Sequence, residues 1–125
     1  KNRLNNKNIK IISNGKSKRN YMHPADLANW LLRTLNFKKI NIINTGSEKN
    51  YTIEELAKKI AKFKYESLEF VNIELGDNKE IQDYIPNLSK AKKLGLKSFI
   101  PLNLQIEDSL KYYYYNYYEK KNSSI

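Results

Sequence analysis

The sequence of 125 residues contains no cysteine, which excludes disulfide bonds, thiolate zinc sites and thiol nucleophiles. Its only histidine is His23, so neither a histidine metal cluster nor a histidine-based catalytic triad can be built. No apolar run approaches the roughly 18 to 20 residues that a membrane-spanning helix needs. No signal peptide is visible either. We therefore expect a soluble, cytoplasmic protein with no membrane partner.

Positive charge is plentiful, with 23 Lys and Arg against 13 Asp and Glu and a net charge of +10. Such an excess raises the expectation of an anionic partner, whether nucleic acid, nucleotide or acidic lipid. The lysines are spread over every segment, however, as is typical of a solvated surface. Only three of the cations are arginines. In so lysine-rich a chain, we expect an arginine to grip a phosphate or carboxylate with its planar fork, which lysine does poorly.

The apolar pattern predicts alternating strands and helices in one domain of ordinary size. The dipeptide Asn14-Gly15 predicts a tight hairpin turn between the first two β-rich runs. Strands are expected over residues 9–12, 16–21, 40–44 and 68–75. Helices are expected over residues 24–35, from residue 52 on, over residues 87–94 and from residue 103 on.

The helix ends carry local signals. Pro24 suits the first turn of a helix, and Thr52 with Glu55 forms a capping box. Asn87 is placed to cap a short helix that Gly95 ends in a left-handed conformation.

The order of strands and helices implies parallel pairing within a larger sheet. These few strands do not suffice for a doubly wound sheet, so we expect the neighbouring strands on a missing N-terminal portion. The start at Lys1, without methionine, agrees with a processed product or a piece of a longer protein.

Four blocks of sequence, in this order and at these distances, resemble the C-terminal part of extended short-chain dehydrogenase/reductases, the NAD-dependent nucleotide-sugar epimerases and dehydratases. The resemblance covers nearly the whole chain. The blocks are residues 19–28 (RNYMHPADLA), 43–47 (INTGS), 52–57 (TIEELA) and 84–96 (YIPNLSKAKKLGL).

The resemblance implies an α/β fold, the substrate-binding C-terminal part of a Rossmann-type enzyme with a few strands and about four helices. By the same resemblance, Arg19 contacts the diphosphate of a nucleotide-sugar and Asn44 lies beside the nucleotide. Tyr21 and His23 complete the expected substrate-binding residues. The helix after His23 and the strand around Ile42 are expected to return to the cofactor-binding sheet of the missing half.

One departure from the family lies in the fourth block. Related sequences often place a second phosphate-contacting arginine just before its tyrosine, where this chain has Asp83. A carboxylate there would repel a diphosphate at close range. Either Lys79 supplies the charge, or the substrate differs, or this copy is impaired.

A second departure concerns catalysis. The family needs a glycine-rich turn for the dinucleotide and a Tyr-x-x-x-Lys pair. The four glycines, at positions 15, 46, 76 and 95, cannot form such a turn, and the only Tyr-x-x-x-Lys is Tyr117 to Lys121, in the charged tail of the last helix. We expect no catalytic residue and no bound cofactor in this chain alone, with NAD(P) held by the full-length enzyme. Residues 1–121 are taken as the substrate-binding module and residues 122–125 as a tail.

Plainer readings compete with these roles. His23 can be a hydrogen-bonded residue at a helix start, Asp26 can complement the helix dipole, and Asn44 can be a turn residue. The tyrosine run, residues 112–118, resembles a stacking platform for single-stranded nucleic acid, although helical geometry favours core packing or an interface. A small basic nucleic-acid-binding module is therefore the alternative function, and half of a split enzyme is a third.

Overall fold

The computed structural model describes residues 3–39, 42–66, 68–78 and 80–122, with the backbone alone for residues 117–122. Within this part of the chain lie four α-helices, one short 3-10 helix and four strands, so the α/β class is confirmed. Their bounds are η1 Arg3–Asn5, β1 Ile9–Ser13, β2 Lys18–Asn20, α1 Pro24–Thr34, β3 Asn50–Thr52, α2 Ile53–Lys62, β4 Ile73–Asn78, α3 Ser89–Lys93 and α4 Leu102–Asn122.

The strands form two separate two-stranded sheets. β1 pairs in parallel with β4, whereas β2 pairs antiparallel with β3. The hairpin predicted at Asn14-Gly15 is therefore wrong, because β1 and β2 do not pair with each other. Gly15 does have a positive φ of 72°, and its carbonyl accepts the backbone N–H of Glu54 at 3.0 Å. The turn thus carries the chain from one sheet to the other across the start of α2.

The strand predicted over residues 68–75 is displaced along the chain, because β4 begins at Ile73, includes Gly76 and ends at Asn78. A Cβ atom at Gly76 would lie 2.0 Å from the backbone oxygen of Ile12. The pairing of β1 with β4 also shifts register between Ile11 and Ser13. Glycine here permits a close backbone approach at an irregular pairing and does not end the strand.

The strand predicted over residues 40–44 is absent from the described residues 42–44, and residues 40–41 lie outside the described part. The side chain of Ile42 is 88% exposed. A segment with β-forming side chains becomes a strand only when a neighbouring strand satisfies its backbone groups. Nothing else in the described chain provides such a neighbour.

The starts of α1 and α2 follow the predicted local signals. His23 is the N-cap of α1, with Pro24 in the first turn. In α2 both bonds of the capping box form: the Glu55 amide donates to the Thr52 hydroxyl at 3.0 Å and the Thr52 amide donates to the Glu55 carboxylate at 2.7 Å. The predicted Asn87 cap of α3 is wrong, because the N-cap is Leu88 without a side-chain cap bond, although the Asn87 side chain accepts the backbone N–H of Ser89 at 3.0 Å. α4 begins at Leu102, one residue before the predicted start at residue 103.

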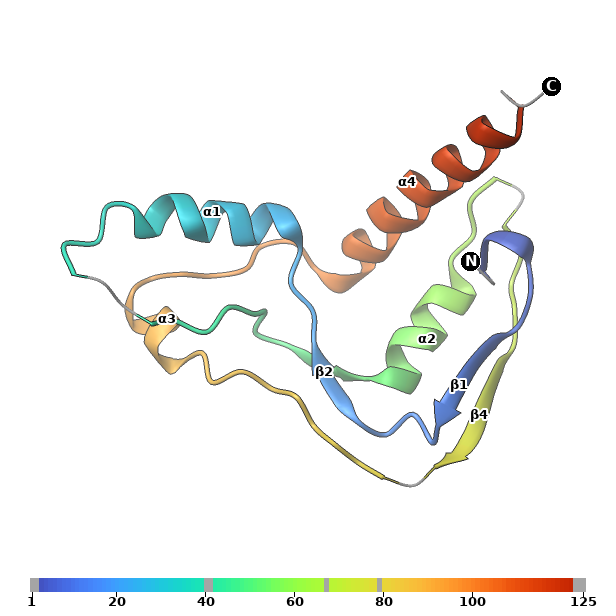
Figure 1. The fold of residues 1–125 in the computed structure, drawn as a ribbon, viewed down its shortest axis with the longest axis horizontal. Helices are drawn as coiled ribbons and strands as arrows, with labels where there is room; N and C mark the ends of the chain where they lie inside the picture. Colours follow the sequence, from blue (N-terminus) through green and yellow to red (C-terminus); the bar gives the residue numbers. More distant parts are fainter. Residues whose placement is uncertain (1–2, 40–41, 67, 79, 123–125) are drawn as a thin grey trace.

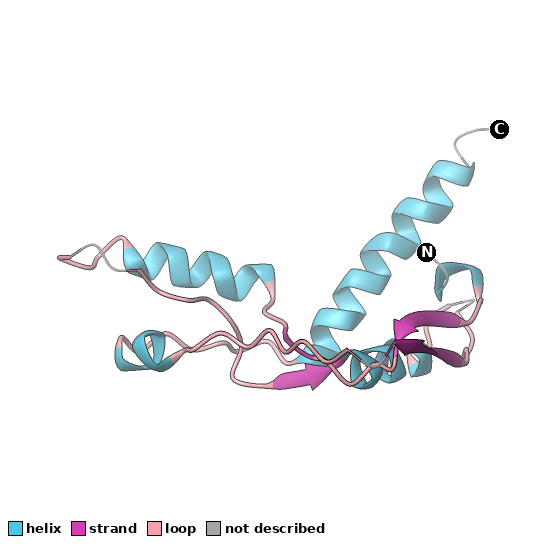
Figure 2. Cartoon of the chain, turned by 60° about the horizontal axis from the view of Figure 1, so that its bottom comes forward, coloured by secondary structure: helices cyan, strands magenta, loops and turns pink. Residues whose placement is uncertain are grey.

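Figure 1 shows α1 and α3 at one end of the molecule and α2, β1 and β4 at the other, with β2 crossing between them. α4 rises away from this flat arrangement, as Figure 2 shows. α2 packs against β1, β4 and α4. At the other end the buried core cluster is Trp30, Ala91 and Leu96, against which Met22, Phe37, Ile43 and Leu94 pack partly buried.

One face of α1 has no cover in the described part of the chain. The sequence predicts an inward stripe that includes Trp30, Leu31 and Leu35, but only Trp30 is buried. Leu31 is 57% exposed and Leu35 is 79% exposed, and the nearby Ile42 is exposed as well. The prediction is wrong for the two leucines, since nothing described in this chain reaches that side of α1.

Side chains of α1 hold the segment that leads to α4. The indole N–H of Trp30 donates to the carbonyl of Lys97 at 2.7 Å, and the Arg33 guanidinium donates to the carbonyl of Gly95 at 3.0 Å. The Asp26 carboxylate accepts the backbone amides of Phe99 and Ile100. No helix in the described residues is both long and apolar enough to cross a membrane.

Candidate functional site

The strand β2 places Arg19 beside tyrosines of the neighbouring segments. Arg19 lies directly opposite Tyr51 of β3 in the antiparallel pairing. Tyr21 directly follows β2, and the positive charge of Arg19 acts on its hydroxyl, so the two side chains are near each other. Arg19 also forms a parallel bridge with Tyr84, so the first and fourth sequence blocks meet here.

The opposite side of β2 is held by Asn20. Its amide oxygen accepts the backbone N–H of Ser47 at 2.7 Å, and its amide nitrogen donates to the carbonyl of Ser47 and to the Asn50 side chain, both at 2.8 Å. A Cβ atom at Gly46 would lie 2.5 Å from this amide oxygen and 2.9 Å from Pro86. Glycine at position 46 therefore allows three of the four sequence blocks to approach closely.

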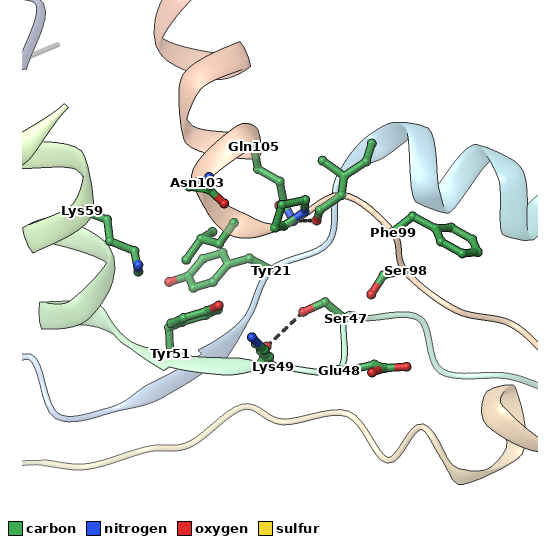
Figure 3. A pocket seen from close by; sticks show the side chains of 13 residues that line it. Tyr21, Ser47, Glu48, Lys49, Tyr51, Lys59, Ser98, Phe99, Asn103 and Gln105 are labelled. Atoms are coloured by element: carbon green, nitrogen blue, oxygen red, sulfur yellow. Dashed lines mark hydrogen bonds between the residues drawn. The ribbon is translucent and has the colours of Figure 1, made fainter. Parts of the chain in front are cut away.

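Between these elements lies a cavity of about 350 Å³ (Figure 3). Its aromatic wall consists of Tyr21 and Tyr51, and Lys59 reaches it from α2. The remaining lining comes from the loop residues Ser47, Glu48 and Lys49, the segment Ser98 to Asn103, and Gln105. The cavity is thus built from the segment after β2, from β3, from α2 and from the start of α4, which are far apart in sequence.

Hydrogen bonds to two side chains, Asp26 and Gln105, hold the cavity wall formed by residues 98–103 in place. Asp26, only 3% exposed, accepts the amides of Phe99 at 3.0 Å and Ile100 at 2.9 Å through one carboxylate oxygen. The side chain of Gln105 donates to the carbonyl of Ile100 at 2.9 Å. Besides complementing the helix dipole, as the sequence indicates, Asp26 thus anchors this wall. A buried carboxylate that accepts two amides is a structural group rather than a free reactant.

The charges near the aromatic wall are mainly positive. The ammonium group of Lys59 lies 5.9 Å from the centre of the Tyr51 ring, within cation–π range. Burial raises the pKa of the Tyr21 hydroxyl, and the positive charge of Arg19 partly opposes this effect. Tyr21 therefore stays protonated at neutral pH and can donate a hydrogen bond to an anion.

Arg19 itself is not among the residues that line the cavity. One terminal nitrogen, Nη1, donates to its own strand at the carbonyl of Lys18, at 2.9 Å, and to the carbonyl of Gln82. Among the described residues, no hydrogen bond from Nε or Nη2 is recorded. The guanidinium thus has a structural role and keeps an edge with which it can meet a ligand.

The other two expected substrate-binding residues lie away from the cavity. The Asn44 side chain is exposed and donates to the carbonyl of Asn87 at 3.2 Å, which ties its loop to the start of α3. His23 accepts the backbone N–H of Ala25 through Nδ1 at 3.1 Å, so its expected place at a helix start is confirmed. Its Nε2 lies 3.5 Å from the carboxylate of Asp108 on α4.

The carboxylate of Asp83 is also occupied. It accepts the backbone N–H of Lys18 at 2.7 Å, beside the bridge between Arg19 and Tyr84. Asp83 therefore joins the fourth sequence block to β2, a role that the comparison with a phosphate-binding arginine does not indicate. Lys79, the expected alternative source of positive charge, lies outside the described residues.

The tyrosines of α4 pack partly on one another. The hydroxyls of Tyr65 and Tyr115 are 2.6 Å apart, and the ring of Tyr65 meets that of Tyr114 edge-on at 5.5 Å. Tyr112 and Tyr113 are more than half exposed and also meet edge-on. The side chains of the predicted Tyr117 and Lys121 pair lie beyond the described part. Edge-on rings do not form a ready stack of parallel faces for bases.

Sequence reasoning missed Asn20, Lys49 and Lys59. Asn20 carries one weak signal, since a polar residue on the strand face opposite Arg19 and Tyr21 needs partners if that face is covered. The two lysines carry none, because nothing in sequence distinguishes them from the other lysines. Within the described residues, no cluster of three or more His, Cys, Asp or Glu side chains could hold a metal ion.

No protein-family model and no curated protein matches the sequence. Solved structures do match. The UDP-N-acetylglucosamine 4-epimerase of Methanobrevibacter ruminantium M1, in complex with UDP-N-acetylmuramic acid, has a TM-score of 0.70 at 18% identity, over 88% of this chain and 36% of its own. The UDP-glucose 4-epimerase of Thermotoga maritima, with UDP-glucose, has a TM-score of 0.68 at 19% identity, over 90% of this chain and 36% of its own.

A third match is the UDP-glucuronic acid 4-epimerase of Bacillus cereus, in complex with UDP-glucuronic acid and NAD. Its TM-score is 0.62 at 21% identity, over 85% of this chain and 35% of its own. The chain therefore spans about a third of the length of these structures. At such identities the likeness concerns the fold, and at that level the predicted resemblance is confirmed: this chain has the fold of the C-terminal part of Rossmann-type extended short-chain dehydrogenase/reductases.

Proposed function

We propose that this chain is the nucleotide-sugar-binding portion of an NAD-dependent epimerase or dehydratase. Arg19 contacts the diphosphate, Tyr21 donates to the ligand from the aromatic wall, and Asn44 and His23 contact parts of the ligand that extend beyond the cavity. The observation that carries the proposal is the pairing of Arg19 with Tyr51, beside a cavity that Tyr21 and Tyr51 line. The solved epimerases of the same fold, which are in complex with UDP-sugars, support it.

The hydrogen bonds of Arg19 suit this role. Its Nη1 is held by two backbone carbonyls, which restricts the rotation of the side chain. The edge formed by Nε and Nη2 then presents two parallel N–H groups, the arrangement that grips a phosphate through two oxygens. A guanidinium positioned in advance loses less entropy on binding than a free one.

The residues of this chain do not fit the NAD that the fold implies. A dinucleotide pyrophosphate needs a glycine-rich turn between a strand and a helix. Here Gly15 precedes a strand, Gly46 lies in a loop, Gly76 is inside β4 and Gly95 follows α3. We therefore assign the cofactor and the catalytic Tyr/Lys pair to a separate cofactor-binding portion, which in this proposal covers the exposed apolar side of α1.

The test is a titration of the ¹⁵N-labelled 125-residue chain with UDP-glucose, followed by amide chemical shifts, which detect millimolar binding. We expect shifts to concentrate in β2, β3 and residues 47–49. Arg19→Ala should weaken binding about tenfold, because a charge-assisted pair to phosphate is lost. Free glucose, which lacks the diphosphate, should bind equally poorly to both proteins.

The control is Arg33→Ala, which also removes a guanidinium that donates to a backbone carbonyl, but on α1 and away from the cavity. It should leave the affinity for UDP-glucose unchanged. The proposal is wrong if the parent chain shows no shifts, or if Arg19→Ala binds as the folded parent does.

A further inference from the structure

Two lysines at the cavity have no acidic partner. Lys49 and Lys59 both line it, and within the described residues neither ammonium group lies within salt-bridge distance of a carboxylate. The neighbouring Lys58, by contrast, pairs with Glu54 at 2.6 Å. Unpaired cations that converge on a concave surface favour an anionic ligand group there.

Neutral donors stand beside these lysines. The hydroxyls of Tyr21 and Tyr51 and the side-chain amide of Asn103 line the same cavity. The only carboxylate in the lining is that of Glu48. In Figure 3, Lys59 lies at the left of the labelled side chains, next to Tyr21 and Tyr51, and Glu48 lies further right, so the part of the cavity near Lys59 and the tyrosines is positive.

This positive end is separate from the proposed diphosphate position at Arg19. Arg19 and Tyr51 are cross-strand partners, and Lys59 lies over the Tyr51 ring with its nitrogen 5.9 Å from the ring centre. Tyr51 therefore neighbours both cationic positions, Arg19 through the strand pairing and Lys59 through its ring. In the nucleotide derivative of an acidic sugar, the sugar-linked phosphate and the acidic group are likewise two anionic positions on one sugar ring.

We propose that the cavity binds the carboxylate of an acidic sugar, so that the preferred ligand is a nucleoside diphosphate linked to a uronic acid. Lys59 and Lys49 hold the carboxylate and the tyrosine rings lie against the sugar. This inference rests on the proposed function, since it places the diphosphate at Arg19. It goes further by naming the class of sugar.

The experiment compares UDP-glucuronic acid with UDP-glucose on the labelled 125-residue chain at low salt. These two probes differ only in the carboxylate. We expect UDP-glucuronic acid to bind about fivefold more tightly, the effect of one solvent-accessible charge pair. The preference should shrink as salt is added, because the pair is screened.

The variants assign the preference to the cavity. Lys59→Gln should abolish most of it and Lys59→Arg, which keeps the charge, should retain it. Lys58→Gln is the matched control, because it removes the adjacent charge on α2 and should retain the preference. Arg19→Lys should weaken both ligands alike and leave their ratio unchanged.

Three results would overturn the inference. Equal affinity of the parent chain for the two probes would refute the preference for an acidic sugar while leaving the proposed function intact. A preference that survives in the Lys49→Gln/Lys59→Gln double variant places the carboxylate elsewhere. Absence of binding of both probes removes the inference together with the proposed function.

Discussion

Asn20 binds Ser47 in both directions: its side-chain oxygen accepts the Ser47 amide at 2.7 Å and its side-chain nitrogen donates to the Ser47 carbonyl at 2.8 Å. The side-chain amide thereby makes the pair of hydrogen bonds that the backbone of a neighbouring strand would make, and it holds the loop that contains Gly46. This loop then supplies Ser47, Glu48 and Lys49 to the cavity. The shape of the candidate site therefore depends on one residue that lies on the other side of β2.

Replacing Asn20 tests this dependence. Asn20→Ala leaves the partly buried amide and carbonyl of Ser47 without partners, which we expect to cost about 2 kcal/mol of unfolding free energy. Asn20→Asp keeps the acceptor and loses the donor, so its loss should be smaller. Urea denaturation followed by circular dichroism measures both. Equal stability of all three proteins would show that the loop does not depend on this pair.

A second test uses Gly46. Gly46→Ala places a Cβ atom 2.5 Å from the Asn20 oxygen and 2.9 Å from Pro86, so the loop must move. We expect destabilisation of about 1 to 3 kcal/mol, typical of a forced overlap. In the double variant with Asn20→Ala, the loss should be less than the sum of the two single losses, because one of the two overlaps has gone. Strict additivity would contradict the close approach.

The sequence predicts the local features well. The capping box of Thr52 and Glu55, the helix start at Pro24 and the left-handed Gly95 depend on hydrogen bonds and backbone geometry within a few residues, and all are present. Two wrong predictions, the hairpin at Asn14-Gly15 and the strand over residues 40–44, concern the pairing of strands. Asn14-Gly15 supplies the turn, but which strand lies beside β1 is decided by β4, some 60 residues away.

The site was harder to predict than the helices. The family resemblance points to Arg19 and Tyr21, yet the cavity is lined by Tyr51, Lys49 and Lys59, which meet only after folding. The prediction that an arginine in this lysine-rich chain grips a phosphate or carboxylate was incomplete too. In the described structure all three arginines donate to backbone carbonyls, which a planar fork also does better than lysine.

Arg3 provides a test of that role. Its side chain is 4% exposed and donates to the carbonyls of Ile60, at 3.1 Å, and Phe63, at the end of α2. Burial lowers the pKa of this guanidinium, but arginine remains charged at any ordinary pH. Arg3→Lys should cost about 1 to 2 kcal/mol because one ammonium cannot satisfy both carbonyls. Arg33→Lys, at an exposed contact, should cost clearly less in the same urea denaturation experiment.

Asp26 should control the wall of the cavity from a distance. Asp26→Ala removes a buried acceptor from the amides of Phe99 and Ile100, with an expected loss of about 2 to 3 kcal/mol. In the folded protein the amide resonances of those two residues should shift, and UDP-glucose should bind more weakly. Asp26→Asn keeps one acceptor oxygen and should retain most of the wall. A stable Asp26→Ala protein with unshifted resonances would refute the anchoring role.

The capping box makes the stability of α2 depend on pH. Hydrogen bonds from the Thr52 backbone and side chain lower the pKa of the Glu55 carboxyl below its usual value of 4.5. The folded state thus binds this proton more weakly than the unfolded state, so the contribution is complete above pH 4.5 and is lost as the pH falls through the lowered pKa. Thermal melting between pH 7 and pH 3 should therefore show a smaller acid-induced loss in Glu55→Gln than in the parent. Identical pH dependence in the two proteins would mean that the bond between the Thr52 amide and the Glu55 carboxylate does not form in solution.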